Sequence, residues 1–114
     1  MLGSYEMSDL DGFETKGHPL CIRFKKGTSE KVREIASQNG LRVSTWIKRL
    51  VFNRVERVLD HKDVSILEYT TAEGYGDQIC IRLSKEEMLE IRRAAIIEKS
   101  MPSPWIRAIV MENI

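Results

Sequence analysis

Two short stretches of the chain alternate strictly between apolar and polar residues. They lie at residues 20–25 and 78–84. A period of two residues is that of a β-strand with one buried face and one solvent face. After each stretch, apolar residues recur with the period of an amphipathic helix, in two successive segments. The pattern therefore predicts a strand followed by two helices, twice. The strand residues expected to point into the core are Leu20, Ile22, Phe24, Ile79, Ile81 and Leu83.

The two halves of this pattern are copies of one another. Residues 79–114 align with residues 20–55 without a gap, at a constant offset of 59 positions. Chance would give about two or three identities over such a length, so ten indicate an internal duplication. The identical positions, numbered in the first copy, are Cys21, Ile22, Arg23, Lys26, Arg33, Ala36, Ser44, Trp46, Ile47 and Val51.

Capping and stop residues mark the expected helix boundaries. Residues 84–87, Ser-Lys-Glu-Glu, form a capping box at the first helix of the second copy. Asn39 and Gly40 end the first helix of the first copy. The second helix of each copy is expected to begin at a serine, Ser44 or Ser103.

Four segments follow from these boundaries. We expect a flexible N-terminal arm over 1–18, a first unit over 19–60, a connector over 61–77 and a second unit over 78–114. Residues 64–69 could form a further short strand or pack on the surface. One strand with two helices is too small to bury a core alone, so both units should form one globular domain. The predicted fold is mostly α, with a two-stranded antiparallel β-ribbon above four helices.

Charge is distributed unevenly along the chain. The net charge is only +1, but residues 20–57 hold ten Lys or Arg against three Asp or Glu, a net charge of +7. Residues 1–19 and 58–77 are acidic, at −3 and −4. A localised basic segment is typical of a nucleic-acid surface, although a solvated helix surface would give the same pattern.

Composition bears on the compartment. With 31% charged residues, the chain has no apolar run near the roughly 20 residues that a membrane span needs. Residues 1–18 lack the positive region and apolar block of a secretory signal. We therefore expect a cytoplasmic protein without a membrane partner, in which both cysteines are reduced thiols.

Recognisable catalytic and metal-binding motifs are not found. No Ser/His/Asp set, paired acidic cluster or Gly-rich phosphate loop falls on a coherent scaffold. Two cysteines and two histidines lack any usual zinc spacing. We expect a protein that is not an enzyme and that holds no cofactor and no metal.

The order of strand, helix, Asn39-Gly40-x-x-Val43-Ser44 and apolar second helix resembles the ribbon-helix-helix DNA-binding proteins, the superfamily of the Arc and methionine repressors. The second copy departs from this pattern at residues 99–102, where the Asn-Gly stop is missing. The resemblance implies that the ribbon enters the major groove and that its outward side chains touch base edges. A tandem fusion in one chain, forming a pseudo-twofold intramolecular dimer, is similar to the TraY-like accessory proteins of conjugation.

The polar face of the predicted ribbon offers side chains that can read bases. Arginine pairs with guanine O6 and N7, and glutamine with adenine. We expect Arg23 and Arg82 to be the main readers. The alternative is that both are solvent-facing charges that discourage edge-to-edge aggregation. The predicted base-reading residues are Cys21, Arg23, Lys25, Gln78, Cys80 and Arg82.

The resemblance also places the beginning of each second helix against the DNA backbone. A helix N-terminus presents unpaired N–H groups and partial positive charge, which suits a phosphate. The alternative is that these positions are ordinary helix caps. Trp46 and Trp105 could stack on bases, but their helical spacing with neighbouring apolar residues favours core packing. The predicted phosphate-contacting residues are Lys26, Arg42, Ser44, Thr45, Lys85, Ser103 and Trp105.

The two cysteines fall at equivalent positions of the two strands. Antiparallel pairing could set Cys21 opposite Cys80 at a separation close to that of a disulfide. A redox switch on the reading face is one hypothesis. Two reduced thiols that touch thymine methyl groups or water are the interpretation that we favour.

Double-stranded DNA is the partner that these patterns predict. The expected function is sequence-specific binding as a transcriptional repressor or regulator. An accessory role at a plasmid transfer origin is the first alternative, and a protein–protein interaction module without DNA binding is an alternative of another class. Because the two copies present different residues, we expect an asymmetric or imperfectly repeated target, bound by one chain or by several chains side by side.

Overall fold

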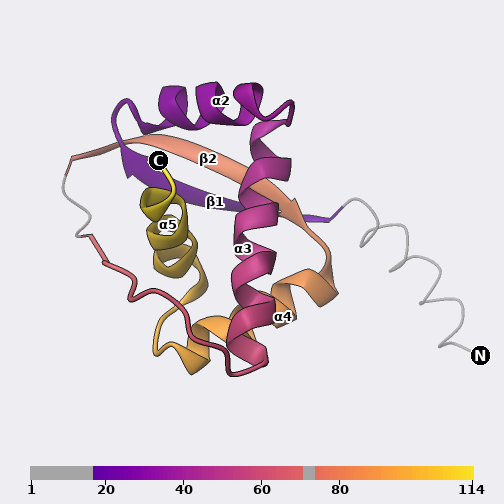
Figure 1. Cartoon of the computed structure of the whole chain (residues 1–114). Helices are drawn as coiled ribbons and strands as arrows, with labels where there is room; N and C mark the ends of the chain where they lie inside the picture. The colour runs from indigo at the N-terminus through magenta and orange to yellow at the C-terminus, as the bar shows by residue number, and fades with distance from the viewer. Residues whose placement is uncertain (1–16, 71–73) are drawn as a thin grey trace, which may run out of the picture.

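The strand–helix–helix order occurs twice along the chain. The computed structural model describes residues 17–70 and 74–114. The first set is β1 (His18–Lys25), α2 (Thr28–Gln38) and α3 (Val43–Leu59), and the second is β2 (Tyr75–Leu83), α4 (Lys85–Ile97) and α5 (Pro102–Glu112) (Figure 1). The arm predicted over 1–18 lies, up to residue 16, outside the described residues, whereas His18 already belongs to β1.

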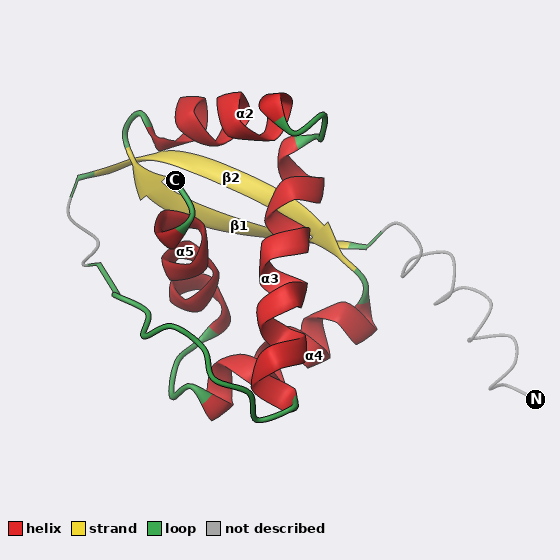
Figure 2. Ribbon diagram, viewed as in Figure 1, coloured by secondary structure: helices red, strands yellow, loops and turns green. Residues whose placement is uncertain are grey.

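The strands β1 and β2 pair as a two-stranded antiparallel sheet. Cys21 lies opposite Cys80 in the middle of the pairing. In Figure 2, α3 and α5 cross one face of this ribbon, and α2 and α4 lie on opposite sides of the molecule. Within the described part of the chain, the predicted two-stranded ribbon and four helices are therefore confirmed, although β2 begins earlier than expected, at Tyr75.

One face of the ribbon is buried against the helices. Both tryptophans lie in this core: Trp105 is 0% exposed and Trp46 is 7% exposed, which confirms that they pack rather than stand free for base stacking. Of the six strand residues predicted to point inward, five are buried and Leu20 is partly buried. The largest fully buried side chains are Trp105, Phe24, Ile22, Ile47, Ile81, Leu83, Ile91, Ile106 and Ile109.

A polar cluster joins the end of α4 in the second copy to α3 in the first. Arg54 on α3 is only 6% exposed, and its guanidinium makes two 2.7 Å hydrogen bonds to the carboxylate of Glu98. It also donates to the Oγ of Ser65 at 2.9 Å and to its carbonyl oxygen. The indole N–H of Trp105 donates to Glu98 at 2.9 Å. The buried positive charge of Arg54 is thus neutralised by an opposite charge, and its N–H groups have hydrogen-bond acceptors.

The segment after α3 packs on the helices without forming a strand. Residues 60–70 have no regular secondary structure. Leu67 reaches the hydrophobic core and Val64 packs against it. Of the two alternatives for residues 64–69, packing is the one observed, and Ser65 anchors the segment through its bonds to Arg54.

The first helix of each copy ends in the same kind of turn. Gly40 has a φ of 69°, and Lys99, at the matching position, has a φ of 58°. The Cβ atom of lysine makes this left-handed region less favourable than it is for glycine. The N–H of Ser100 nevertheless donates to the carbonyl of Ala95 at 2.8 Å, which completes the helix-ending motif. The turn of the second copy therefore closes without the Asn-Gly signal.

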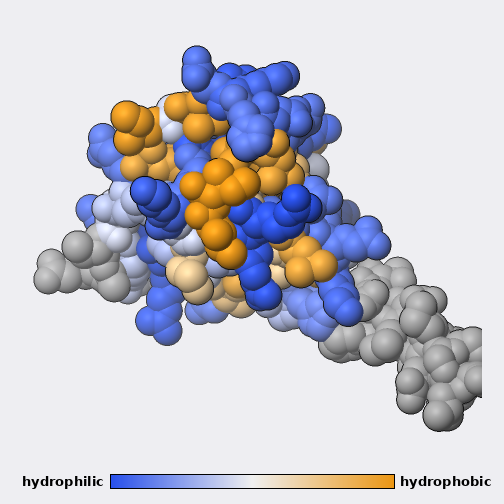
Figure 3. All heavy atoms as spheres, turned by 90° about the horizontal axis from the view of Figure 1, so that it is seen from below, coloured by the Kyte–Doolittle hydropathy of each residue, from blue (hydrophilic) through white to orange (hydrophobic). Residues whose placement is uncertain are grey.

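The second copy exposes large hydrophobic side chains around α4. Figure 3 views the molecule from the side on which α4 lies in Figure 1, and hydrophobic groups gather there among hydrophilic ones. The matching positions of α2 and its following turn are polar, so the two copies differ on this outer surface. The exposed side chains are Leu89, Ile96, Ile97 and Met101. Within residues 17–70 and 74–114, none of the helices has both the length and the apolar character needed to cross a bilayer.

Candidate nucleic-acid interface

The outward face of the ribbon gathers all six residues predicted to read bases. Every one of them is exposed, whereas the residues that alternate with them in the middle of the two strands, from Ile22 to Phe24 and from Ile79 to Leu83, are buried in the core. In the register of the sheet, Arg23 lies opposite Gln78 and Arg82 lies opposite Pro19, with the cysteine pair between these rows. Lys25 extends the face at the Arg23 end. The six side chains therefore form one surface, which we call the reading face.

The two arginines sit at opposite ends of the reading face. Arg23 is two residues beyond Cys21 on β1, and Arg82 is two residues beyond Cys80 on the antiparallel strand. Their positions are thus four residues apart along the ribbon, roughly 13 Å at the rise of a β-strand. Arg107 on α5 fixes one end, because its Nε donates to the carbonyl oxygen of Arg23 at 2.7 Å. Its guanidinium also lies over the ring of Tyr75, 4.5 Å from the centroid.

The reading face carries positive charge without an acidic neighbour on either strand. The only acidic residue of β1 and β2 is Asp77, and its carboxylate is turned to the N-terminus of α2. There Oδ2 accepts 2.9 Å hydrogen bonds from the N–H of Gly27 and from both the N–H and the hydroxyl of Ser29. Hydrogen bonds from Ser29 are the main cause that lowers the pKa of Asp77 below 3.8. Asp77 therefore caps α2 from the other strand and leaves the reading face cationic.

Neutralising Asp77 should lower stability in a pH-dependent way. The pKa of Asp77 is lower in the folded protein than in the unfolded chain, so the ionised carboxylate stabilises the fold at pH values above the unfolded-state pKa of 3.8. This contribution is lost as the pH falls below 3.8 and through the lower folded-state pKa. We expect D77N to melt at a lower temperature than the parent at pH 7, and the difference to close as the pH drops toward 3. Thermal unfolding followed by circular dichroism measures this. The matched control is E68Q, which neutralises an exposed carboxylate of the connector. Its melting temperature should not show a difference from the parent that disappears at low pH.

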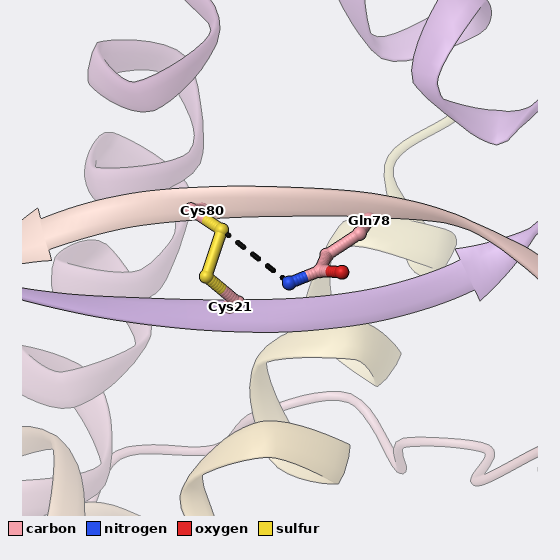
Figure 4. Close-up of a disulfide and its surroundings, with 3 residues drawn as sticks. All are labelled: Cys21, Gln78 and Cys80. Carbon is pink, nitrogen blue, oxygen red and sulfur yellow. Dashed lines mark hydrogen bonds between the residues drawn. A yellow bond between two sulfur atoms is a disulfide. The ribbon is translucent and has the colours of Figure 1, made fainter.

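The cysteines at the centre of the reading face are joined by a disulfide. Cys21 and Cys80, which we expected to be reduced thiols, are bonded, with their Cα atoms 3.9 Å apart (Figure 4). The expectation is wrong because register sets the two residues directly opposite each other. The side-chain amide of Gln78 lies 3.7 Å from the Sγ of Cys80. The centre of the face therefore offers a covalent bridge instead of two thiol donors.

Beside the reading face, a polar groove leads to the N-terminus of α3. Arg42, Ser44 and Gln78 line it together with Arg33 of α2. Arg33 was missed at the sequence level, although its identity in both copies was the available signal. Two guanidinium groups and a helix N-terminus give this groove the chemistry of a phosphate site. Lys26 and Thr45, which we also predicted to contact phosphates, are exposed nearby in the sequence but do not line the groove.

The helix beginning at this groove differs from the prediction by one residue. The first residue of α3 is Val43, its N-cap is Arg42 and no side chain caps it. Ser44 therefore lies inside the first turn and is not the cap. The N–H of Trp46 already donates to the carbonyl of Arg42 at 2.9 Å. The amides without an acceptor inside the helix are those of residues 43–45.

The matching end of α5 offers fewer donors. This helix begins at Pro102 with Met101 as its N-cap, so Ser103 is again a first-turn residue instead of a cap. Pro102 and Pro104 have no N–H, and the N–H of Trp105 donates to the carbonyl of Met101 at 3.0 Å. Ser103 alone supplies a first-turn amide. The side chain of Trp105 is buried, so this residue offers nothing to a phosphate.

The surface beside the ribbon is also less polar on this second side. The groove between the start of β1 and α4 is lined mainly by apolar residues, with Lys85 and Arg92 as its charged residues. The positions equivalent to Ser29 and Gln78 of the polar groove are Met88 and Pro19 here. The two flanks of the ribbon therefore differ in the number of groups that could hold an anion.

Comparisons with known proteins do not place the chain in a group. No protein-family model, curated protein or solved structure matches it.

Proposed function

We propose that this chain binds double-stranded DNA sequence-specifically, with the β1–β2 ribbon inserted in the major groove. In this proposal the two strand–helix–helix copies act as the halves of one pseudo-twofold ribbon-helix-helix dimer, as the sequence resemblance implies. The observation that carries it is the reading face, on which Arg23, Arg82 and Gln78 are exposed and to which neither strand adds an acidic side chain. The major groove is about 12 Å wide and admits a two-stranded ribbon.

The flanks of the ribbon would hold the DNA backbone unequally. On the first side, Arg33, Arg42 and the first two residues of α3, Val43 and Ser44, line a polar groove. On the second side, Ser103 is the only first-turn amide donor of α5, because two of the three residues there are prolines. Phosphate contacts position a protein without reading sequence. We therefore expect the first half to grip the backbone more strongly than the second.

The cross-strand pairs of the reading face also predict which DNA sequence is bound. Arg23 and Arg82, roughly 13 Å apart along the ribbon, would address guanines about four base pairs apart at 3.4 Å per step. Gln78 beside Arg23 adds an adenine contact to one half-site, whereas Pro19 beside Arg82 adds none. The expected site is an imperfect repeat with more information in one half. Binding to one defined DNA site is what a transcriptional regulator requires, and this is the role that we propose.

Selection of binding sites from random duplex DNA tests the proposal, followed by titration of the selected site by fluorescence anisotropy. We expect R23A and R82A each to weaken the selected site by about 5- to 150-fold, which corresponds to 1–3 kcal/mol, and to relax the preferred base at one position. R33A should weaken all sequences alike and reduce the salt dependence.

The control for these variants is K31A, which removes the same charge from the exposed surface of α2. It should leave sequence preference unchanged. Recovery of no common motif, or equal losses in R23A, R82A and K31A, would contradict sequence reading by the ribbon. Absence of any salt-sensitive binding would favour a protein–protein interaction module instead.

A further inference from the structure

We propose that Cys21 and Cys80 form a reversible thiol–disulfide exchange site on the reading face, whose reactants are small or protein-borne thiols, and whose redox state sets the strength of DNA reading. The exchange chemistry stands on the disulfide itself, and its effect on DNA rests on the proposed function. Both cysteines are exposed, and they occupy the central row between Arg23 and Arg82. Within residues 17–70 and 74–114, no helix lies over the sulfur atoms on this face of the ribbon, which leaves both cysteines open to an incoming thiol (Figure 4).

The surroundings of the two sulfur atoms differ. Cys80 lines the polar groove together with Arg33 and Arg42, whereas Cys21 is not part of that groove. Guanidinium groups stabilise a thiolate, so the sulfur that lies beside them is the better leaving group. We therefore assign Cys21 as the sulfur that is attacked and Cys80 as the sulfur that leaves.

The exchange consumes two thiols and releases one disulfide. The first thiolate forms a bond to the Sγ of Cys21, the Cys21–Cys80 bond breaks, and its electron pair goes to Cys80, which takes up a proton from solvent. A second thiolate attacks the outer sulfur of the mixed disulfide and frees Cys21 as a thiol. The protein gains two electrons and two protons, and the reductant leaves as its disulfide. Reoxidation runs the same steps backwards.

Reduction would change what the centre of the reading face presents to DNA. Bonded sulfurs are about 2.05 Å apart, whereas unbonded heavy atoms prefer roughly 3.5–4 Å. The two thiols must therefore separate in a row whose Cα atoms are only 3.9 Å apart, either by rising toward the groove floor or by spreading the strands. Thiols that turn outward would occupy the place of the groove floor between the two arginines, and strands that spread would move Arg23 relative to Arg82. The oxidised form is thus preorganised for reading, and reduced protein should bind about 5- to 10-fold more weakly.

Native-state thiol trapping tests the exchange without DNA. The folded protein is treated with reduced glutathione, then with a maleimide, and analysed by mass spectrometry. We expect two labels per molecule without prior unfolding, a transient glutathione adduct on Cys21, and loss of labelling after oxidised glutathione is added. Labelling that requires denaturant, or a glutathione adduct only on Cys80, overturns the assignment.

Titration of the selected duplex with oxidised and reduced protein tests the effect on reading. The matched control is the C21S/C80S variant, which should bind with one affinity under both conditions. Circular dichroism at the titration temperature confirms that every sample is folded. Reversible labelling with equal affinities of the oxidised and reduced forms would overturn the effect on reading and leave the exchange site standing. Failure of every form to bind any duplex would overturn the DNA-binding proposal itself.

Discussion

Replacing Arg54 by alanine is expected to lower the free energy of unfolding by about 3–5 kcal/mol. This guanidinium is nearly inaccessible to solvent and satisfies both carboxylate oxygens of Glu98. Among the residues that the structure describes, its removal leaves a partly buried carboxylate with the indole N–H of Trp105 as its remaining side-chain donor. It also releases Ser65, which anchors the segment after α3. For a domain of this size the loss corresponds to a fall of about 10–25 °C in the melting temperature.

The pKa of Glu98 explains why the loss should exceed that of a surface ion pair. Burial alone raises the pKa of this carboxyl group, but hydrogen bonds from Arg54 and Trp105 outweigh burial and hold it below the usual 4.5. Without Arg54, burial should win and the pKa should rise. Circular dichroism melts at pH 7 and NMR titration of the carboxyl group measure the two effects.

A neighbouring arginine provides the control. Arg57 is exposed, lies one turn further along α3 and makes one hydrogen bond to the carbonyl of Asp63. R57A should change the free energy of unfolding by at most about 0.5 kcal/mol, as is usual for surface positions. The double variant R54M/E98Q removes both charges and should recover most of the loss. Equal stability of R54A and R57A would contradict the role given to the buried pair.

The fold follows from the sequence where the determinants are local. Period-two alternation placed both strands and their inward faces correctly, and the capping box at Ser84 and Glu87 is observed, with bonds of 3.0 and 2.8 Å. Asn39 and Gly40 end α2 as predicted. In these cases the signal and its structural effect lie within a few residues, so periodicity and capping rules are sufficient.

Long-range determinants are not visible in such patterns. The cap of α2 comes from Asp77, 48 residues away from Ser29, and the partner of Arg54 is 44 residues distant. Neither spacing has a periodicity that marks it. The serines Ser44 and Ser103 resemble caps in sequence, but the chain is already helical one residue earlier. The first of these contacts depends on the register of the ribbon, which sets Asp77 opposite Phe24, and the second depends on how α3 packs against the end of α4.

Breaking the disulfide between Cys21 and Cys80 is the second change with a large expected effect on stability. The bond joins residues 59 positions apart, and closing a loop of that length removes about 4 kcal/mol of chain entropy from the unfolded state at 25 °C. It also links the two strands that carry the reading face. We expect reduction, or the C21S/C80S substitution, to lower the melting temperature by about 10–20 °C.

Chemical denaturation with and without reductant separates this effect from a change in the native fold. The midpoint should fall, while the native circular dichroism spectrum stays the same, because the remaining ladder, core and Arg54–Glu98 pair are intact below the transition. A reductant should leave C21S/C80S unaffected, which excludes action elsewhere. An oxidised protein no more stable than the reduced one would mean that strain in the native ribbon offsets the entropic gain. The disulfide would then have a role in the chemistry of the reading face but none in stability.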